Sequence, residues 1–122
     1  MRIRAFLLCA VFILGLAAPI FAADLAGSYS AQGTNPDGTG KYKGSVIITR
    51  TQDTYQVVWS VGAVYVGTGL VVGDVFSVAY ADENKSWFGV VAYRILDGGK
   101  KLEGIWSAHG GKVLGSETLE KQ

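Results

Sequence analysis

The stretch KYKGSVIITRTQDTYQVVWS (residues 41–60) contains two segments of alternating residues joined by a polar turn. The residues that share one face are Tyr42, Gly44, Val46 and Ile48 in the first segment and Tyr55, Val57 and Trp59 in the second. A period of two on either side of a short turn is typical of an antiparallel β-hairpin with one buried face. Residues 41–60 therefore predict a half-buried hairpin.

The same pattern extends over the rest of the chain from residue 26 onward. Turn signals rich in Gly, Asp and Asn recur about every 8 to 12 residues, a spacing typical of all-β domains. The predicted strands are 26–32, 41–50, 54–61, 63–72, 75–81, 87–96, 101–107 and 112–119. Strands joined by short turns pair antiparallel. We therefore expect an all-β fold, an antiparallel eight-stranded up-and-down meander barrel, with a two-sheet β-sandwich as the alternative.

Glycines recur inside the predicted strands, close to aromatic residues. Examples are Gly27, two residues before Tyr29, and Gly104, two residues before Trp106. Narrow barrels fill their interior by setting small residues beside large ones. We expect these glycines to make room for aromatic rings.

Two central strands are apolar on both faces, at Leu70-Val71-Val72 and at Val90-Val91. Either a bulge shifts the face assignment there, or the outer wall carries an apolar patch. Such patches mark contacts with a protein partner or with a second copy of the chain. A homo-oligomer is therefore one expectation.

The first 22 residues have the features of a cleaved signal peptide. A basic start at Arg2 and Arg4 precedes a run of 14 apolar residues, 5–18, which is short for a membrane span. The predicted cut lies between Ala22 and Ala23, and an uncleaved anchor is the alternative. We expect a periplasmic or secreted protein with a single β-barrel domain at 23–122. The only cysteine, Cys9, lies in the signal, so the mature chain has no thiol.

Composition and charge limit the classes of partner that the chain is expected to bind. Hydrophobic residues make up 49% and charged residues 17% of the chain, which excludes intrinsic disorder. Without Arg2 and Arg4, nine of the 11 basic residues remain against 10 acidic ones, a net charge of −1. This balance argues against nucleic-acid binding.

Residues with catalytic potential are few. His109, the only histidine, lies in a glycine-rich turn with no nucleophile motif around it. Asp82 and Glu83 are adjacent in a polar turn, where solvated acids are usual. We expect no catalytic site, no metal and no cofactor, and therefore not an enzyme. An envelope enzyme or enzyme inhibitor that uses the His109 loop is a minor alternative.

Aromatic residues are the candidate ligand-binding residues. They are Trp87, Tyr93, Trp59 and Trp106. We expect Trp59 and Trp106 to pack in the core, whereas Trp87 follows a polar turn and is expected at a rim, where an indole can anchor a partner.

Several short motifs together resemble a known family. They are Gly27-Ser-Tyr29, Gly33-Thr-Asn-Pro-Asp-Gly38, Tyr42-x-Gly44, Tyr55-x-Val57-x-Trp59 and Leu102-x-Gly104-x-Trp106. The chain resembles small exported alphaproteobacterial proteins that carry the label fibronectin-binding protein, and the resemblance covers nearly the whole mature chain. It implies adhesion to a host matrix protein and supplies no site residues. The expected architecture is also similar, at the level of fold, to calycin-type barrels such as avidins and lipocalins, which hold ligands in the barrel mouth.

Two functions follow as the main hypotheses. The first is a non-enzymatic binding protein whose outer wall or strand edges engage an extracellular-matrix or envelope protein, with fibronectin as the partner that the resemblance implies. The second is a periplasmic carrier of a small apolar ligand, held in the barrel mouth near Trp59, Trp106 and Tyr93. An eight-stranded barrel has room for its own side chains or for one small ligand, and the sequence does not distinguish the two.

Overall fold

A computed structural model describes residues 23–122, and the predicted signal segment 1–22 lies outside the described residues. The described chain forms eight strands and one short 3₁₀ helix. They are β1 (Gly27–Thr34), β2 (Lys41–Thr51), β3 (Thr54–Ser60), β4 (Val64–Val72), β5 (Val75–Asp82), β6 (Phe88–Leu96), η2 (Asp97–Gly99), β7 (Lys101–Ala108) and β8 (Gly115–Lys121). In this part of the chain, no helix is long and apolar enough to cross a membrane.

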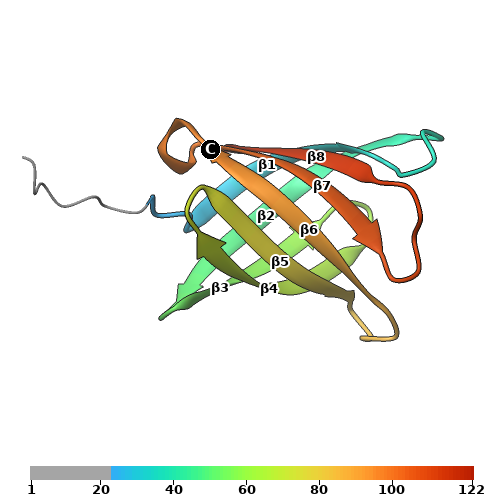
Figure 1. The fold of residues 1–122 in the computed structure, drawn as a ribbon, viewed down its shortest axis with the longest axis horizontal. Coiled ribbons are helices and arrows are strands. Elements are labelled where there is room, and N and C mark those ends of the chain that lie inside the picture. Colours follow the sequence, from blue (N-terminus) through green and yellow to red (C-terminus); the bar gives the residue numbers. More distant parts are fainter. Residues whose placement is uncertain (1–22) are drawn as a thin grey trace, which may run out of the picture.

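The strands form a closed barrel in chain order, as Figure 1 shows. Each strand pairs antiparallel with the next, and β8 pairs antiparallel with β1, with Tyr29 opposite Lys121 and Thr34 opposite Ser116. This last ladder uses the two edges that a meander would otherwise leave unpaired. The predicted eight-stranded up-and-down barrel is therefore confirmed, and the alternative two-sheet sandwich is wrong.

The start of the last strand differs from the prediction. β8 begins at Gly115, not at residue 112. Its first partner on β7 is Trp106, and its first partner on β1 is Thr34, opposite Ser116. The paired residues of β8 begin at Gly115 on the β7 side and at Ser116 on the β1 side, and residues 112–114 belong to the β7–β8 loop. The other strand ends agree with the prediction or differ from it by one or two residues.

Alternation places one face of every strand inside the barrel. The buried apolar residues are Leu25, Tyr29, Ala31, Val46, Ile48, Tyr55, Val57, Trp59, Phe76, Val78, Val91, Tyr93, Leu102 and Leu119. The ladders on both sides of β5 run in unbroken register, so no bulge shifts the faces. Leu70, Val72 and Val90 therefore point outward, and Val72 is 73% exposed. Of the two explanations for the doubly apolar strands, an apolar outer wall is confirmed.

Interior glycines make room for aromatic rings on the neighbouring strand. Four directly opposed pairs of this kind are Gly33 with Tyr42, Gly89 with Tyr80, Gly104 with Tyr93 and Gly115 with Trp106. In each pair, a Cβ added to the glycine would overlap the opposing ring. The expected pairing of small and large residues is confirmed, although the partners lie across the ladder and not along one strand.

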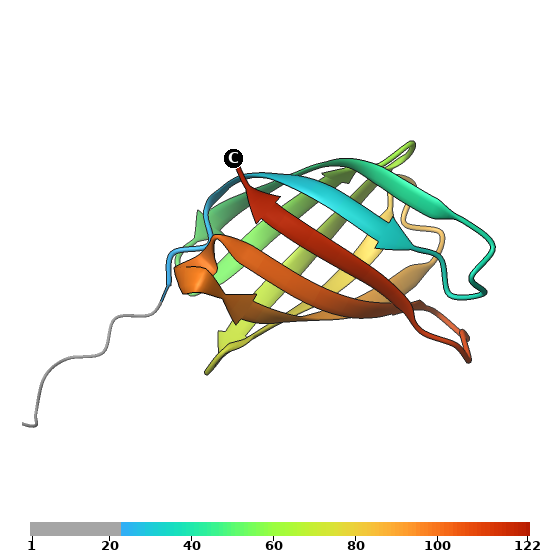
Figure 2. The same ribbon diagram turned by 90° about the horizontal axis from the view of Figure 1, so that it is seen from above.

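The two ends of the barrel differ. At one end the chain segment before β1 packs across the opening, with the Leu25 side chain fully buried. The Tyr29 hydroxyl contacts the carbonyl oxygens of Leu25 at 2.7 Å and Gly99 at 3.2 Å, which ties this segment to η2. The loops β1–β2, β5–β6 and β7–β8 lie together at the opposite end (Figures 1 and 2). The barrel is thus plugged at one end and bordered by loops at the other.

The Gly104–Tyr93 pair gives a test of this packing. A Cβ at Gly104 would lie 2.6 Å from the Tyr93 ring, which is buried, so the ring would have to shift. We expect Gly104→Ala to lower the free energy of unfolding in urea by about 1–3 kcal/mol.

Gly40→Ala is the matched control, because a Cβ there meets only the Asn35 amide at 3.4 Å. We expect it to leave the free energy of unfolding unchanged or to raise it by up to about 1 kcal/mol. Equal unfolding midpoints for the two variants would contradict the packing described here.

Candidate functional site: the barrel mouth

A cavity of about 270 Å³ opens at the loop end of the barrel. Its lining residues are Asn35, Tyr42, Trp59, Val61, Tyr65, Tyr80, Trp87, Val91, Tyr93, Trp106 and Glu117. Seven of these eleven residues are aromatic, and one is charged. The volume equals that of roughly nine water molecules in the liquid, so it suits a small ligand.

The aromatic rings on one side of the cavity form a connected cluster. The Tyr80 ring lies 5.6 Å from the ring of Trp59, 6.1 Å from that of Tyr65 and 5.9 Å from that of Trp87, measured between centroids. Across the mouth, Tyr42 and Trp106 make an edge-to-face pair at 6.3 Å. Edge-to-face contacts fix the orientation of each ring. Ring contacts thus connect most of the aromatic side chains that line the cavity.

Glu117 lies between the cavity and the packed core and is 5% exposed. Its carboxylate accepts hydrogen bonds from the Tyr42 hydroxyl at 2.9 Å, from the Trp59 indole N–H at 3.0 Å and from the Tyr93 hydroxyl. β2, β3 and β6 supply the three donors, and β8 supplies the acceptor. This carboxylate network joins four strands across the interior.

The strand alternation brings Glu117 inside. It shares the inward face of β8 with Gly115 and Leu119, which are both buried. Sequence reasoning missed this residue, because it considered acidic residues only in turns. The signal in the sequence was an acidic residue on the face of the predicted strand 112–119 that also carries Gly115 and Leu119.

Burial and the Glu117 charge both act on the tyrosines of the mouth. Loss of hydration on burial is the main cause that raises the pKa of Tyr42 and Tyr93 well above the usual range, and the nearby Glu117 carboxylate raises both further. Burial, followed by the influence of Tyr65 and Glu117, raises the pKa of Tyr80 to about 12. All three hydroxyls therefore stay protonated at neutral pH, and those of Tyr42 and Tyr93 donate hydrogen bonds to Glu117.

Asp82 holds the loop that carries Trp87. Its carboxylate accepts hydrogen bonds from the Ser86 hydroxyl at 2.6 Å, the Ser86 N–H at 2.7 Å and the Trp87 N–H at 3.1 Å. The Ser86 hydroxyl bond is the main reason why the pKa of Asp82 is lowered from its ordinary value. Asp82 is partly exposed at the end of β5, in line with the expected solvated acid, and its carboxylate also organises the β5–β6 loop.

All four candidate residues from the sequence line the same cavity. Trp59 is buried in the core cluster, and Tyr93 is 1% exposed at the cavity floor. Trp106 is partly buried against the core, and its indole N–H donates to the Ser116 carbonyl at 3.2 Å. Trp87 is 37% exposed at the rim, as expected. The three tryptophans of the chain therefore all line the mouth of the barrel.

His109 has no catalytic surroundings in the structure. Its exposed ring packs on Phe88 at a centroid distance of 4.6 Å, on the outside of the barrel. Among residues 23–122, no group of three or more His, Cys, Asp or Glu side chains is arranged to hold a metal ion.

Comparisons with known proteins do not assign the chain to a family. The chain matches no protein-family model and no curated protein sequence. The resemblance to the small exported family therefore stays a prediction.

Asp82 provides a test of how the mouth is built. We expect Asp82→Ala to speed hydrogen exchange at the backbone amides of Ser86 and Trp87, because both lose their acceptor. The core amides of β6 should exchange as before. The control is Asp37→Ala, because Asp37 makes the same kind of local bonds to the Thr39 N–H and hydroxyl in the β1–β2 loop. Unchanged protection at Trp87 in Asp82→Ala would show that the carboxylate does not hold the loop.

Proposed function

We propose that the protein is a non-enzymatic binding protein that carries a small ligand in its barrel mouth. The observation that supports this most is the aromatic cavity itself. Eight-stranded barrels of this size are often filled by their own side chains, whereas here about 270 Å³ beside the tryptophans is left open. Binding sites are typically concave and mostly apolar, with a few fixed polar groups. The mouth has this composition.

Export remains part of the proposal. It rests on the basic start, the apolar run and the small residues before Ala23 in the sequence, and these lie outside the described residues. An exported carrier would meet its ligand in the periplasm or outside the cell, so the ligand would not need to cross the inner membrane. The proposed assignment as a non-enzyme rests on the exposed position of His109, whose ring packs on Phe88, and on the local hydrogen bonds of Asp82 within the β5–β6 loop.

Native mass spectrometry of the mature chain, purified from a periplasm, tests the carrier role. We expect a complex whose mass exceeds that of residues 23–122 by a small molecule. Where the compound is lost during purification, a thermal-shift screen of neutral, cationic and anionic fragments replaces it, and we expect at least one fragment to raise the melting temperature. A bare chain that no fragment stabilises would contradict the carrier role.

Trp87 should matter for binding more than for folding. The ring is 37% exposed and contacts Tyr65 and Tyr80 at the rim. We expect Trp87→Ala to weaken binding of the compound identified above by about tenfold or more. The free energy of unfolding should fall by at most about 1 kcal/mol. The buried Trp59 is the comparison, because Trp59→Ala should cost about 3–5 kcal/mol. Equal losses of stability in the two variants would place Trp87 in the core.

A protein partner is the second candidate, and one observation favours it. An apolar row crosses the outer wall in direct register, from Ile47 through Val58, Val66 and Ala81 to Phe88. Ile47 and Phe88 are each 53% exposed. The resemblance noted above names fibronectin as the partner to test.

For this candidate, immobilised fibronectin should retain the wild-type chain and release Phe88→Ser, while Ser116→Ala, on the outer face of β8, serves as the control. No retention of the wild-type chain would contradict fibronectin binding. The native mass spectrum described above also shows whether two copies of the chain associate.

A further inference from the structure

We propose that the ligand of the mouth is a small organic cation, an amine in its protonated form or a quaternary ammonium, held between the Glu117 carboxylate and the surrounding aromatic rings. This inference rests on the ligand-binding role proposed above and adds the chemical class of the ligand.

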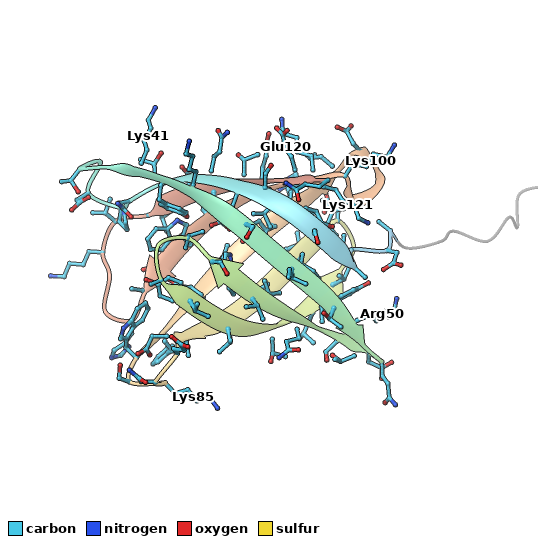
Figure 3. The ribbon with its side chains drawn as sticks, turned by 180° about the vertical axis from the view of Figure 1, so that it is seen from behind. Lys41, Arg50, Lys85, Lys100, Glu120 and Lys121 are labelled. Atoms are coloured by element: carbon cyan, nitrogen blue, oxygen red, sulfur yellow. The ribbon has the colours of Figure 1, made fainter. Side chains whose placement is uncertain are left out.

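The first argument is that residues 23–122 place no basic side chain in the lining of the cavity around Glu117. Both ion pairs among residues 23–122, Arg94 with Asp74 and Lys101 with Glu103, lie elsewhere. Figure 3 shows Lys41 and Lys85, at the loop end of the barrel, pointing outward into solvent, and both are exposed. The described chain therefore holds a nearly buried carboxylate without a cationic partner.

The second argument is the bonding capacity of this carboxylate. Its partners, Tyr42, Trp59 and Tyr93, are neutral donors, so they orient the carboxylate without cancelling its charge. A carboxylate has about four acceptor sites, which leaves one for a further donor. Since Glu117 also lines the cavity, a ligand can reach it. Buried charges are usually paired, and a cationic ligand would complete this pair.

The third argument is the aromatic lining. The π faces of Trp and Tyr attract cations, and aromatic cages are a known way of binding quaternary ammonium groups. Trp59, Tyr65, Tyr80 and Trp87 are linked by ring contacts between 5.6 and 6.1 Å, and Tyr42 with Trp106 faces them across the mouth. An ammonium group bound above Glu117 would meet several of these rings together.

The electrostatics of the mouth also disfavour an anionic ligand. The Glu117 carboxylate helps to raise the pKa values of Tyr42, Tyr80 and Tyr93, because it disfavours a second negative charge nearby. An anionic ligand would meet the same repulsion, whereas a cation would be attracted. A neutral ligand of equal shape would gain only the apolar contacts.

Three compounds that share one ring and differ in charge test the inference on the wild-type mature protein. They are benzylammonium, benzyl alcohol and benzoate. Quenching of tryptophan fluorescence measures each affinity, because the three tryptophans of the chain all line the cavity. We expect benzylammonium to bind about tenfold or more tightly than benzyl alcohol, and benzoate to bind most weakly.

Two variants identify the charge that is responsible. Glu117→Gln keeps the side-chain shape and removes the charge, so the preference for benzylammonium over benzyl alcohol should fall to the smaller margin that the aromatic rings alone provide. Glu120→Gln makes the same change on the same strand, at an exposed residue that points outward in Figure 3, and the preference should persist. Circular dichroism shows whether each variant is folded. The comparison of the three compounds on the wild-type protein needs no variant.

The outcomes separate this inference from the proposed carrier role. Equal affinities for benzylammonium and benzyl alcohol would overturn the cation preference and leave the carrier role standing. If benzoate bound most tightly, the mouth would prefer anions to cations, which would overturn the inference. No binding of any of the three would also overturn it, and the native mass spectrum and the fragment screen would then decide the carrier role separately. A preference of undiminished size in folded Glu117→Gln would show that Glu117 is not the group that selects the charge.

Discussion

The buried carboxylate of Glu117 and its three hydrogen-bond donors determine how the interior of this barrel is divided. Tyr42, Trp59 and Tyr93 reach the carboxylate from three strands, so four of the eight strands meet at one polar point. Toward the plugged end lies a packed core that includes Leu25, and toward the loops lies the aromatic cavity. Removing a charge from water is costly, and the three donors offset part of that cost. A leucine at this position would suit a closed core better, so the glutamate is a departure from good packing of the kind found at functional sites.

The same chain builds a rigid base and an accessible mouth. At the plugged end, the Tyr29 hydroxyl fastens Leu25 and η2, and burial raises its pKa to about 12, so it remains a donor. Rings such as Tyr93 lie over glycines on the neighbouring strand, which fixes their positions without filling the mouth. At the loop end, Asp82 fastens the turn that presents Trp87. A site supported in this way needs little rearrangement to receive a ligand, which lowers the cost of binding.

Sequence reasoning predicted the barrel well because its signals are local. Alternation in 41–60 and regular turns are enough to place most strands. Closure into a barrel was favoured over a sandwich only because it pairs both edges, and the faces of the doubly apolar strands were left open. The start of β8 was wrong, because its pairing with β7 and β1 begins only at Gly115 and Ser116, and alternation within the segment does not show where pairing with other strands begins. The four aromatic candidates were brought together as predicted, yet Glu117 was missed. Its role depends on donors 24 to 75 residues away in the chain, and such contacts appear only when the barrel closes.

A crystal structure of the mature protein with benzylammonium tests the account most directly, since it shows both the occupant and its orientation. We predict one molecule in the mouth, its ring among Trp59, Tyr80 and Trp87. Its ammonium nitrogen should lie about 2.7–2.9 Å from a carboxylate oxygen of Glu117, the distance of a charge-assisted hydrogen bond. A ligand whose ammonium group points to solvent while its ring fills the cavity would contradict the central role of Glu117. An empty mouth at a saturating concentration would contradict the binding site itself.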